Sequence, residues 1–172
     1  MTVAPEERIA EEVAREVVKT RRIVGALGEA IRAAHSTASP ALAAATQARE
    51  NLYDEIEAEF GLLTSAQAGE AMGSRSTAKR NLASAAYRDG RLLALRRGNY
   101  MLYPAFQFSE SGLRPVIADL IALGRQHHRT SAGIIQWLMA PTTYLAGRRP
   151  VDVIDAPEQL LAAAGDAFGV QW

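Results

Sequence analysis

Apolar residues recur at intervals of three and four along the first sixty residues of the chain. The first stripe consists of Val13, Val17, Thr20, Val24, Leu27 and Ile31. A break at residues 35–40 separates it from a second stripe, made of Leu42, Ala45, Leu52, Ile56 and Phe60. Such spacing places the apolar positions of each segment on one face of a helix. Residues 5–60 are therefore predicted to form a helical hairpin, whose second helix begins at Ser39-Pro40 and stops at Gly61.

Two interpretations of these stripes stay open. The two helices can cover each other and the rest of the protein, or the heptad-like stripe can form the seam of a homodimer. The seam is shorter than the three to four heptads that define a coiled coil. Acidic residues outnumber basic ones by 11 to 7 in residues 5–60, so we do not expect this part to bind nucleic acid.

Residues 61–108 have the pattern of a winged helix-turn-helix. Thr64 and Gln67 are spaced as a capping box at the start of a short helix. A Gly73-Ser74 turn leads to a second helix, predicted over residues 76–89. After Gly90 the apolar positions change period, and Gly98-Asn99 between apolar runs predicts a β-hairpin that ends at Pro104. Helix, turn, helix and hairpin is the order of elements in a winged helix.

Positive charge is concentrated in this segment. The whole chain has 19 basic and 19 acidic residues, whereas residues 64–103 have seven basic and two acidic ones. The start of the second helix is predicted to read bases while cations reach phosphates. The predicted DNA-binding residues are Arg75, Ser76, Thr77, Lys79, Arg80, Asn81, Ser84, Arg96, Arg97 and Asn99. The alternative is a small helical domain with a solvated basic face. Because the chain is neutral overall, binding to duplex DNA is expected to require a dimer.

Residues 109–172 predict a small helical module. Pro115 opens one helix, residues 131–139 form another, and Pro141 ends it. A loop over residues 144–150 leads to a last helix from Pro157 to Phe168. The predicted fold is therefore mainly α, with segments 1–60, 61–108 and 109–172.

Composition argues against catalysis and against metal binding. The chain has 172 residues, no cysteine and three histidines, so neither thiolate chemistry nor a histidine-rich metal site is expected. It has no G-x-x-x-x-G-K-[ST] phosphate loop, and no cofactor is expected. The acidic N-terminus does not resemble a signal peptide, and no apolar run approaches the roughly 20 residues that cross a bilayer. A soluble cytoplasmic protein that is not an enzyme is expected.

The run from Trp137 to Asp152 resembles the C-terminal domain of Xre/MbcA/ParS-type antitoxins. That family has a W-L-x-x-P-N-x-x-L-x-G-x-x-P pattern before a leucine-rich final helix. The chain matches it at Trp137, Leu138, Pro141, Leu145, Gly147 and Pro150. It departs from the pattern at Thr142, where the family often has Asn. The likeness covers roughly residues 90–172.

The resemblance implies an antitoxin. Members of this family neutralise a RES-domain toxin that degrades NAD, commonly by placing their C-terminus in its active-site cleft, and they bind their own promoter. The residues that it implies for toxin binding are Tyr144, Leu145, Gly147, Arg148, Arg149, Pro150, Phe168 and Trp172. Trp137 is expected in the core instead. The alternative is a winged-helix regulator or adaptor with no toxin partner.

Overall fold

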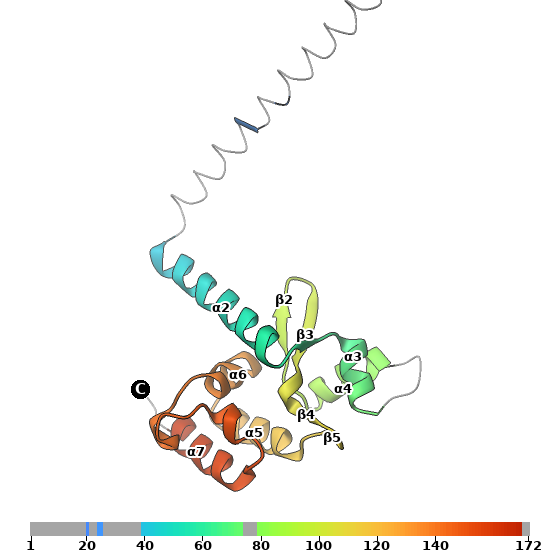
Figure 1. Ribbon diagram of the computed structural model, residues 1–172, viewed down its shortest axis with the longest axis vertical. Coiled ribbons are helices and arrows are strands. Elements are labelled where there is room, and N and C mark those ends of the chain that lie inside the picture. The colour runs from blue at the N-terminus through green and yellow to red at the C-terminus, as the bar shows by residue number, and fades with distance from the viewer. Residues whose placement is uncertain (1–19, 21–23, 26–38, 74–78, 170–172) are drawn as a thin grey trace, which may run out of the picture. The chain divides into compact units, whose positions relative to one another are not determined.

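The computed structural model describes residues 20, 24–25, 39–73 and 79–169 (Figure 1). The chain divides into two units, residues 1–49 and 50–172. Most of the predicted first helix of the hairpin lies outside the described residues, although Thr20, Val24 and Gly25 are helical. The described part is mainly helical with a small antiparallel sheet, which confirms the predicted fold class.

The second helix of the predicted hairpin is α2, Pro40–Glu59. The Ser39 hydroxyl oxygen accepts a hydrogen bond from the Leu42 amide at 3.2 Å, so Ser39 caps the helix as predicted. The helix is followed by Gly61, whose φ of 89° is in the left-handed region that favours glycine. Tyr53 and Ile56 are buried, whereas Leu42 is 61% exposed. The predicted apolar stripe is therefore buried only toward the end of the helix.

Three short strands form an antiparallel sheet in the order β1-β3-β2. Strand β2, Leu95–Arg97, pairs with β3, Tyr100–Pro104, as the predicted hairpin. Strand β1, Leu62–Leu63, pairs with the other edge of β3, with Leu63 opposite Tyr103. A short 3-10 helix, η1 (Ala105–Gln107), leads to a second hairpin, β4 (Phe108–Ser109) and β5 (Gly112–Leu113).

Two helices pack against this sheet and against each other, and residues 74–78 between them lie outside the described residues. Helix α3, Ser65–Ala71, begins with the predicted capping box, because Thr64 and Gln67 bond each other's backbone amides. Helix α4, Lys79–Arg88, ends one residue before the predicted position. Ala68, Ala83 and Ala86 meet Tyr103 of β3 in a small core. Alanine side chains allow the close approach of helix to strand that this core needs.

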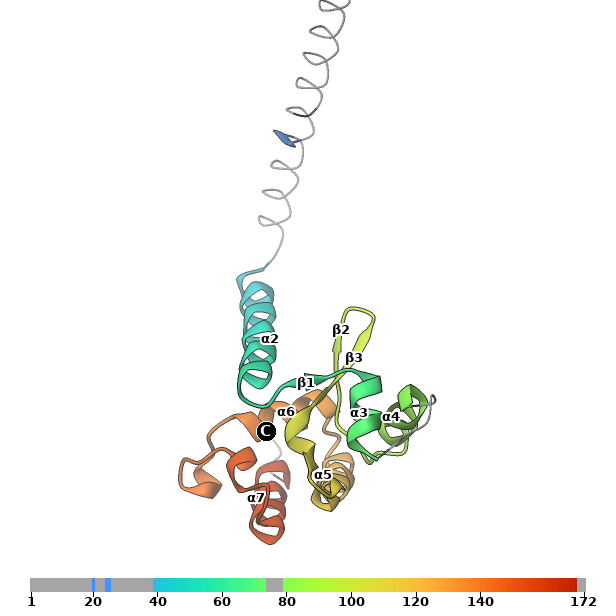
Figure 2. The same ribbon diagram turned by 45° about the vertical axis from the view of Figure 1, so that its right-hand side comes forward.

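The C-terminal helices follow the predicted positions. They are α5 (Pro115–Gln126), α6 (Ser131–Met139) and α7 (Pro157–Gly169), with the 3-10 helices η2 (Thr143–Leu145) and η3 (Pro150–Val153) between the last two. Figure 2 shows α5, α6 and α7 grouped beside the sheet. A large core joins these helices to Ile56 of α2, Leu95 of β2 and Phe106 of η1. The predicted boundary at residue 108 stays a prediction, and side chains from both sides of it share this core.

Candidate nucleic-acid interface

Helix α4 exposes a polar and cationic face. Ala83 and Ala86 are buried against the sheet, whereas Arg80, Asn81 and Ser84 are exposed. Positions 80, 84 and 88 are four residues apart, so they lie on one side of the helix. The predicted contacts Arg75, Ser76 and Thr77 lie outside the described residues, and so does the side chain of Lys79. Helix α4 itself contains no acidic residue, so its outer face suits a polyanion.

The β2–β3 hairpin carries the second predicted part of the interface. Arg96, Arg97, Asn99 and Tyr100 are exposed around its two-residue turn. The turn begins with Gly98 at a φ of 60°, a conformation that glycine adopts without strain. In Figures 1 and 2 the hairpin projects beyond α3 and α4. It therefore presents its tip to solvent as the wing of a winged helix does.

Sequence analysis missed Tyr100 as a candidate contact, because an aromatic residue in an apolar run is more often buried. Its side chain is 76% exposed at the hairpin tip, next to Arg97. Exposed aromatic rings can stack on sugars or bases. Its position directly after the Gly98-Asn99 turn was the available signal.

The end of α2 holds the hairpin in place. The Tyr53 hydroxyl donates a hydrogen bond of 2.7 Å to the Arg96 carbonyl oxygen. The Arg97 guanidinium lies 2.7 Å from a Glu50 carboxylate oxygen and 5.1 Å from the centre of the Tyr53 ring. Arg97 was predicted to contact DNA at the hairpin tip; that stays a prediction, and in the structure the side chain is paired with Glu50 of α2. Arg80 and Arg96 make no ion pair with a described residue, so they are the better candidates for phosphate contacts.

Two side chains, one from η1 and one from α6, hold the stem of the hairpin at residues 93 and 94. Gln107 is fully buried; its amide oxygen accepts from the Leu93 amide at 2.6 Å and its amide nitrogen donates to the Leu93 carbonyl at 3.0 Å. The Ser131 hydroxyl bonds both backbone groups of Ala94, at 2.8 and 2.9 Å. Each side chain thus acts as a partner strand for one residue of the hairpin stem. These residues position the hairpin, and sequence analysis did not single them out.

One solved structure with a similar fold is "NMR structure of Rv2175c". It matches with a TM-score of 0.52 and 20% sequence identity, over 63% of this chain and 82% of that chain. At this identity the likeness shows the fold alone. No family model and no curated protein matches the chain.

The residues of the antitoxin-like pattern have different surroundings. Tyr144 is 47% exposed, and Gly147 and Arg148 are exposed as well. Leu145 and Phe168 are each 3% exposed, and Pro150 is also buried. Phe168 packs edge-on against Trp137, with 5.0 Å between ring centres. Trp172 lies outside the described residues. The predicted partner contacts Leu145, Pro150 and Phe168 therefore stabilise the core in this structure, and the exposed candidates are Tyr144, Gly147 and Arg148.

Local backbone geometry explains several residues of that pattern. The Thr142 hydroxyl caps η2 by accepting from the Tyr144 amide at 3.4 Å, a role that an asparagine side chain can also fill. Gly147 has a φ of 84°, and its amide donates to the Thr142 carbonyl at 2.9 Å. The loop closes when the Thr142 amide donates to the Arg148 carbonyl at 3.1 Å. Thr142, Gly147 and Pro150 thus fix the shape of the loop that presents Tyr144 and Arg148.

Arg149, another predicted partner contact, is the centre of an internal ion-pair network. Its guanidinium nitrogens lie 2.6 Å from Glu59 and 2.7 Å from Asp152, and 3.4 Å from Glu55. Hydrogen bonds from Arg149 lower the pKa of the Glu59 and Asp152 carboxyl groups below their ordinary values, and these bonds raise the pKa of Arg149. Its side chain is 22% exposed. Arg149 therefore links η3 to the end of α2 and is not a free surface cation.

Proposed function

We propose that this protein is an antitoxin-like DNA-binding protein. It binds duplex DNA through α4 and the β2–β3 hairpin, represses its own promoter, and neutralises a RES-type, NAD-degrading toxin by direct binding. The observation that carries the DNA-binding part is the acid-free outer face of α4 on the same unit as a projecting basic hairpin. The promoter and the RES-type toxin come from the resemblance of residues 137–152 to the antitoxin family, and exposed residues support each binding role.

The DNA-binding part assigns different tasks to the exposed residues. Arg80 and Arg96 contact phosphates, which supplies affinity without sequence preference. Asn81 contacts a base edge, because an amide can donate and accept toward adenine in the major groove. Tyr100 stacks at the hairpin tip beside them. Arg97 exchanges its Glu50 partner for phosphate, since an exposed ion pair contributes only about 0–1 kcal/mol.

A homodimer completes this proposal. Specific DNA binding by one neutral chain of 172 residues is weak, and two copies double the number of phosphate contacts. Leu42 on α2 is 61% exposed, and it belongs to the apolar stripe that can form the seam of a homodimer. In sedimentation experiments Leu42→Glu should shift the protein toward the monomer, whereas Ala44→Glu on the same helix tests the effect of charge alone.

The toxin-binding part is supported by the pattern between Trp137 and Pro150 and by what it exposes. Tyr144 and Arg148 lie at the two ends of a closed loop whose shape Thr142 and Gly147 fix. Tyr and Arg are enriched among the residues that carry binding energy in protein interfaces. A rigid loop with these two side chains loses little entropy when it binds a partner.

A second candidate function is a winged-helix regulator or adaptor with no toxin partner. The burial of Leu145, Pro150 and Phe168 favours it, because packing alone is then sufficient to explain these residues of the pattern. Both candidates share DNA binding and differ only in the partner.

A mobility-shift assay on the DNA upstream of the protein's own gene tests the shared part. We expect binding at low salt that weakens steeply as salt rises, because phosphate contacts release counterions. No shift at low salt with micromolar protein would contradict the proposal. Co-purification with the product of the neighbouring gene then separates the antitoxin from the regulator.

A further inference from the structure

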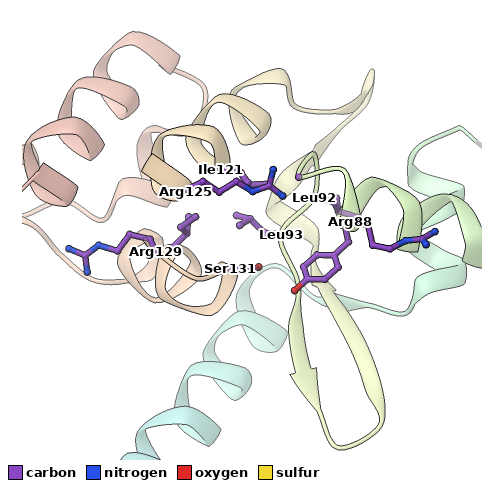
Figure 3. Close-up of a pocket in the computed structure, with 10 residues that line it drawn as sticks. Arg88, Leu92, Leu93, Ile121, Arg125, Arg129 and Ser131 are labelled. Atoms are coloured by element: carbon purple, nitrogen blue, oxygen red, sulfur yellow. The ribbon is translucent and has the colours of Figure 1, made fainter. Parts of the chain in front are cut away.

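A cavity of about 270 Å³ lies between the end of α4, the hairpin stem and the helices α5 and α6 (Figure 3). None of the proposed DNA contacts on α4 or at the hairpin tip lines it, although Arg88 of the lining lies on the same side of α4 as Arg80 and Ser84. Its lining residues are Tyr87, Arg88, Gly90, Leu92, Leu93, Ile121, Arg125, Arg129, Ser131 and Ile134.

The lining is strongly positive. It contains Arg88, Arg125 and Arg129, and it contains no carboxylate. None of the three arginines forms an ion pair with a residue in the described part of the chain. The Arg88 side chain donates to the Ser84 carbonyl at 3.4 Å, and the Arg129 guanidinium lies 5.5 Å from the centre of the Phe168 ring. Three guanidinium groups that have no ion pair with a described residue surround one cavity, and this favours an anionic occupant.

Arg125 is the arginine that reaches across the cavity. In Figure 3 its guanidinium points toward Leu92, whereas those of Arg88 and Arg129 turn outward on opposite sides. It lies against Gly90: a Cβ atom built on that glycine would be 2.4 Å from an Arg125 guanidinium nitrogen. Gly90 also has a φ of 73°. The glycine that ends α4 therefore leaves room for the cation as well as making the turn.

The remaining walls are apolar. Leu92, Leu93, Ile121 and Ile134 are each at most 6% exposed, so they close the cavity from behind and offer a ligand little surface. The Ser131 hydroxyl is already bonded to both backbone groups of Ala94, so it offers little to a ligand. An apolar cavity of about 150 Å³ can hold a benzene molecule, so this larger one has room for a ring with a charged group.

We propose that this cavity binds a small organic anion, a carboxylate or phosphate on a flat apolar body. Arg125 binds the charged group, the body of the ligand fills the space beside it, and the exposed Arg88 and Arg129 side chains turn toward the charge. The site requires neither DNA nor a toxin, and it goes beyond the function proposed above.

Benzoate and its neutral analogue benzamide form a matched pair of probes for this site. We expect benzoate to shift the NMR signals of the Gly90, Leu93 and Ser131 amides saturably in the full-length protein. Benzamide should bind at least about tenfold more weakly, because it lacks the charge that Arg125 recognises. Equal binding of the two probes, or no shift at millimolar benzoate, would overturn the proposal without any variant.

Two variants test whether Arg125 is the residue that binds the carboxylate of benzoate. Arg125→Gln should raise the benzoate dissociation constant about tenfold. Arg91→Gln should not, because Arg91 is a neighbouring exposed arginine outside the lining that pairs with Asp89 at 3.3 Å. Equal losses in both variants would show a general charge effect and overturn the site. Displacement of benzoate by duplex DNA would also overturn it, since the arginines would then serve a DNA phosphate.

Discussion

At the scale of single residues, the arginines of this chain have different roles because their neighbours differ. Arg80 is exposed on a helix without acids, whereas Arg97 is paired with Glu50 and lies over Tyr53. Arg125 lies against Gly90 at a cavity. In the sequence alone, Arg80 and Arg97 are equivalent candidates for DNA contacts, because both are arginines of the same basic segment. Their surroundings separate Arg80, which has no ion pair with a described residue, from Arg97, which has one.

This difference predicts the effect of substitution on DNA binding. Arg80→Ala should weaken binding to every duplex and reduce the slope of log K against log salt by about 1, because one phosphate contact is lost. Asn81→Ala should instead relax preference at one base pair, by about 1–3 kcal/mol. Mobility shifts at two salt concentrations measure both effects. Arg148→Ala, an exposed arginine of the C-terminal loop, is the control, and an equal loss in it would contradict the assignment.

The ion pairs of Arg149 predict that the stability of the protein depends on pH. Its hydrogen bonds lower the pKa of Glu59 and Asp152 from ordinary values of 4.5 and 3.8. The resulting stabilisation is therefore present above those values and is lost as pH falls through the lowered pKa values of the folded state. Arg149→Gln should reduce the free energy of unfolding near pH 7 and reduce it less near pH 3, because protonation of the two carboxylates weakens the ion pairs. Urea unfolding at both pH values measures this, with Arg148→Gln as the control. An Arg149→Gln effect that is equal at both pH values would argue against the ion pairs.

At the scale of elements, the hairpin depends on side chains from outside it. A two-stranded hairpin is marginally stable alone, and Gln107, Ser131 and Tyr53 bond its stem and one of its strands. Since Gln107 is fully buried, its loss leaves the Leu93 amide and carbonyl without these partners. The hairpin is thus held by elements on both sides of it.

Gln107→Leu should therefore destabilise the protein strongly. The free energy of unfolding is expected to fall by about 2–4 kcal/mol, because buried backbone groups lose hydrogen bonds. Gln136→Leu, at an exposed position of α6, is the matched control and should change it by less than about 0.5 kcal/mol. Urea unfolding gives both numbers. A neutral Gln107→Leu variant would show that the stem is held by packing alone.

The elements that could be predicted from the sequence are those set by local chemistry. Ser39-Pro40, the Thr64–Gln67 capping box and the Gly98-Asn99 turn each act within a few residues, so the pattern was sufficient. Strand β1 could not be predicted, because Leu63 pairs with Tyr103 across forty residues. The bond from Gln107 to Leu93 likewise exists only once the chain is folded. The sequence was therefore sufficient to predict which segments form the candidate site. It was not sufficient to predict which acidic residue pairs with each arginine.

At the scale of the whole molecule, the burial of the last helix determines which variants can test a partner-binding role. Removal of the chain from Ala164 onward would delete Ala164 and Phe168, which are 0% and 3% exposed in the core. Unfolding of that truncated protein would therefore say nothing about a partner. Exposed side chains of the loop between η2 and η3 give the sharper test, because their loss leaves the core intact.

The last prediction is a separation of the two proposed activities within one unit. Replacing Tyr144 by Ala together with Arg148→Glu should abolish co-purification with a neighbouring RES-type protein and rescue from its toxicity, because an aromatic anchor and a charge are both lost. Promoter binding should persist, since α4 and the hairpin tip are untouched. Arg80→Ala should show the reverse: weakened promoter binding and intact rescue. Circular dichroism checks that both variants remain folded. If the double variant still rescues cells, the partner surface lies elsewhere; if no toxin co-purifies with the unaltered protein, the winged-helix regulator is the better description.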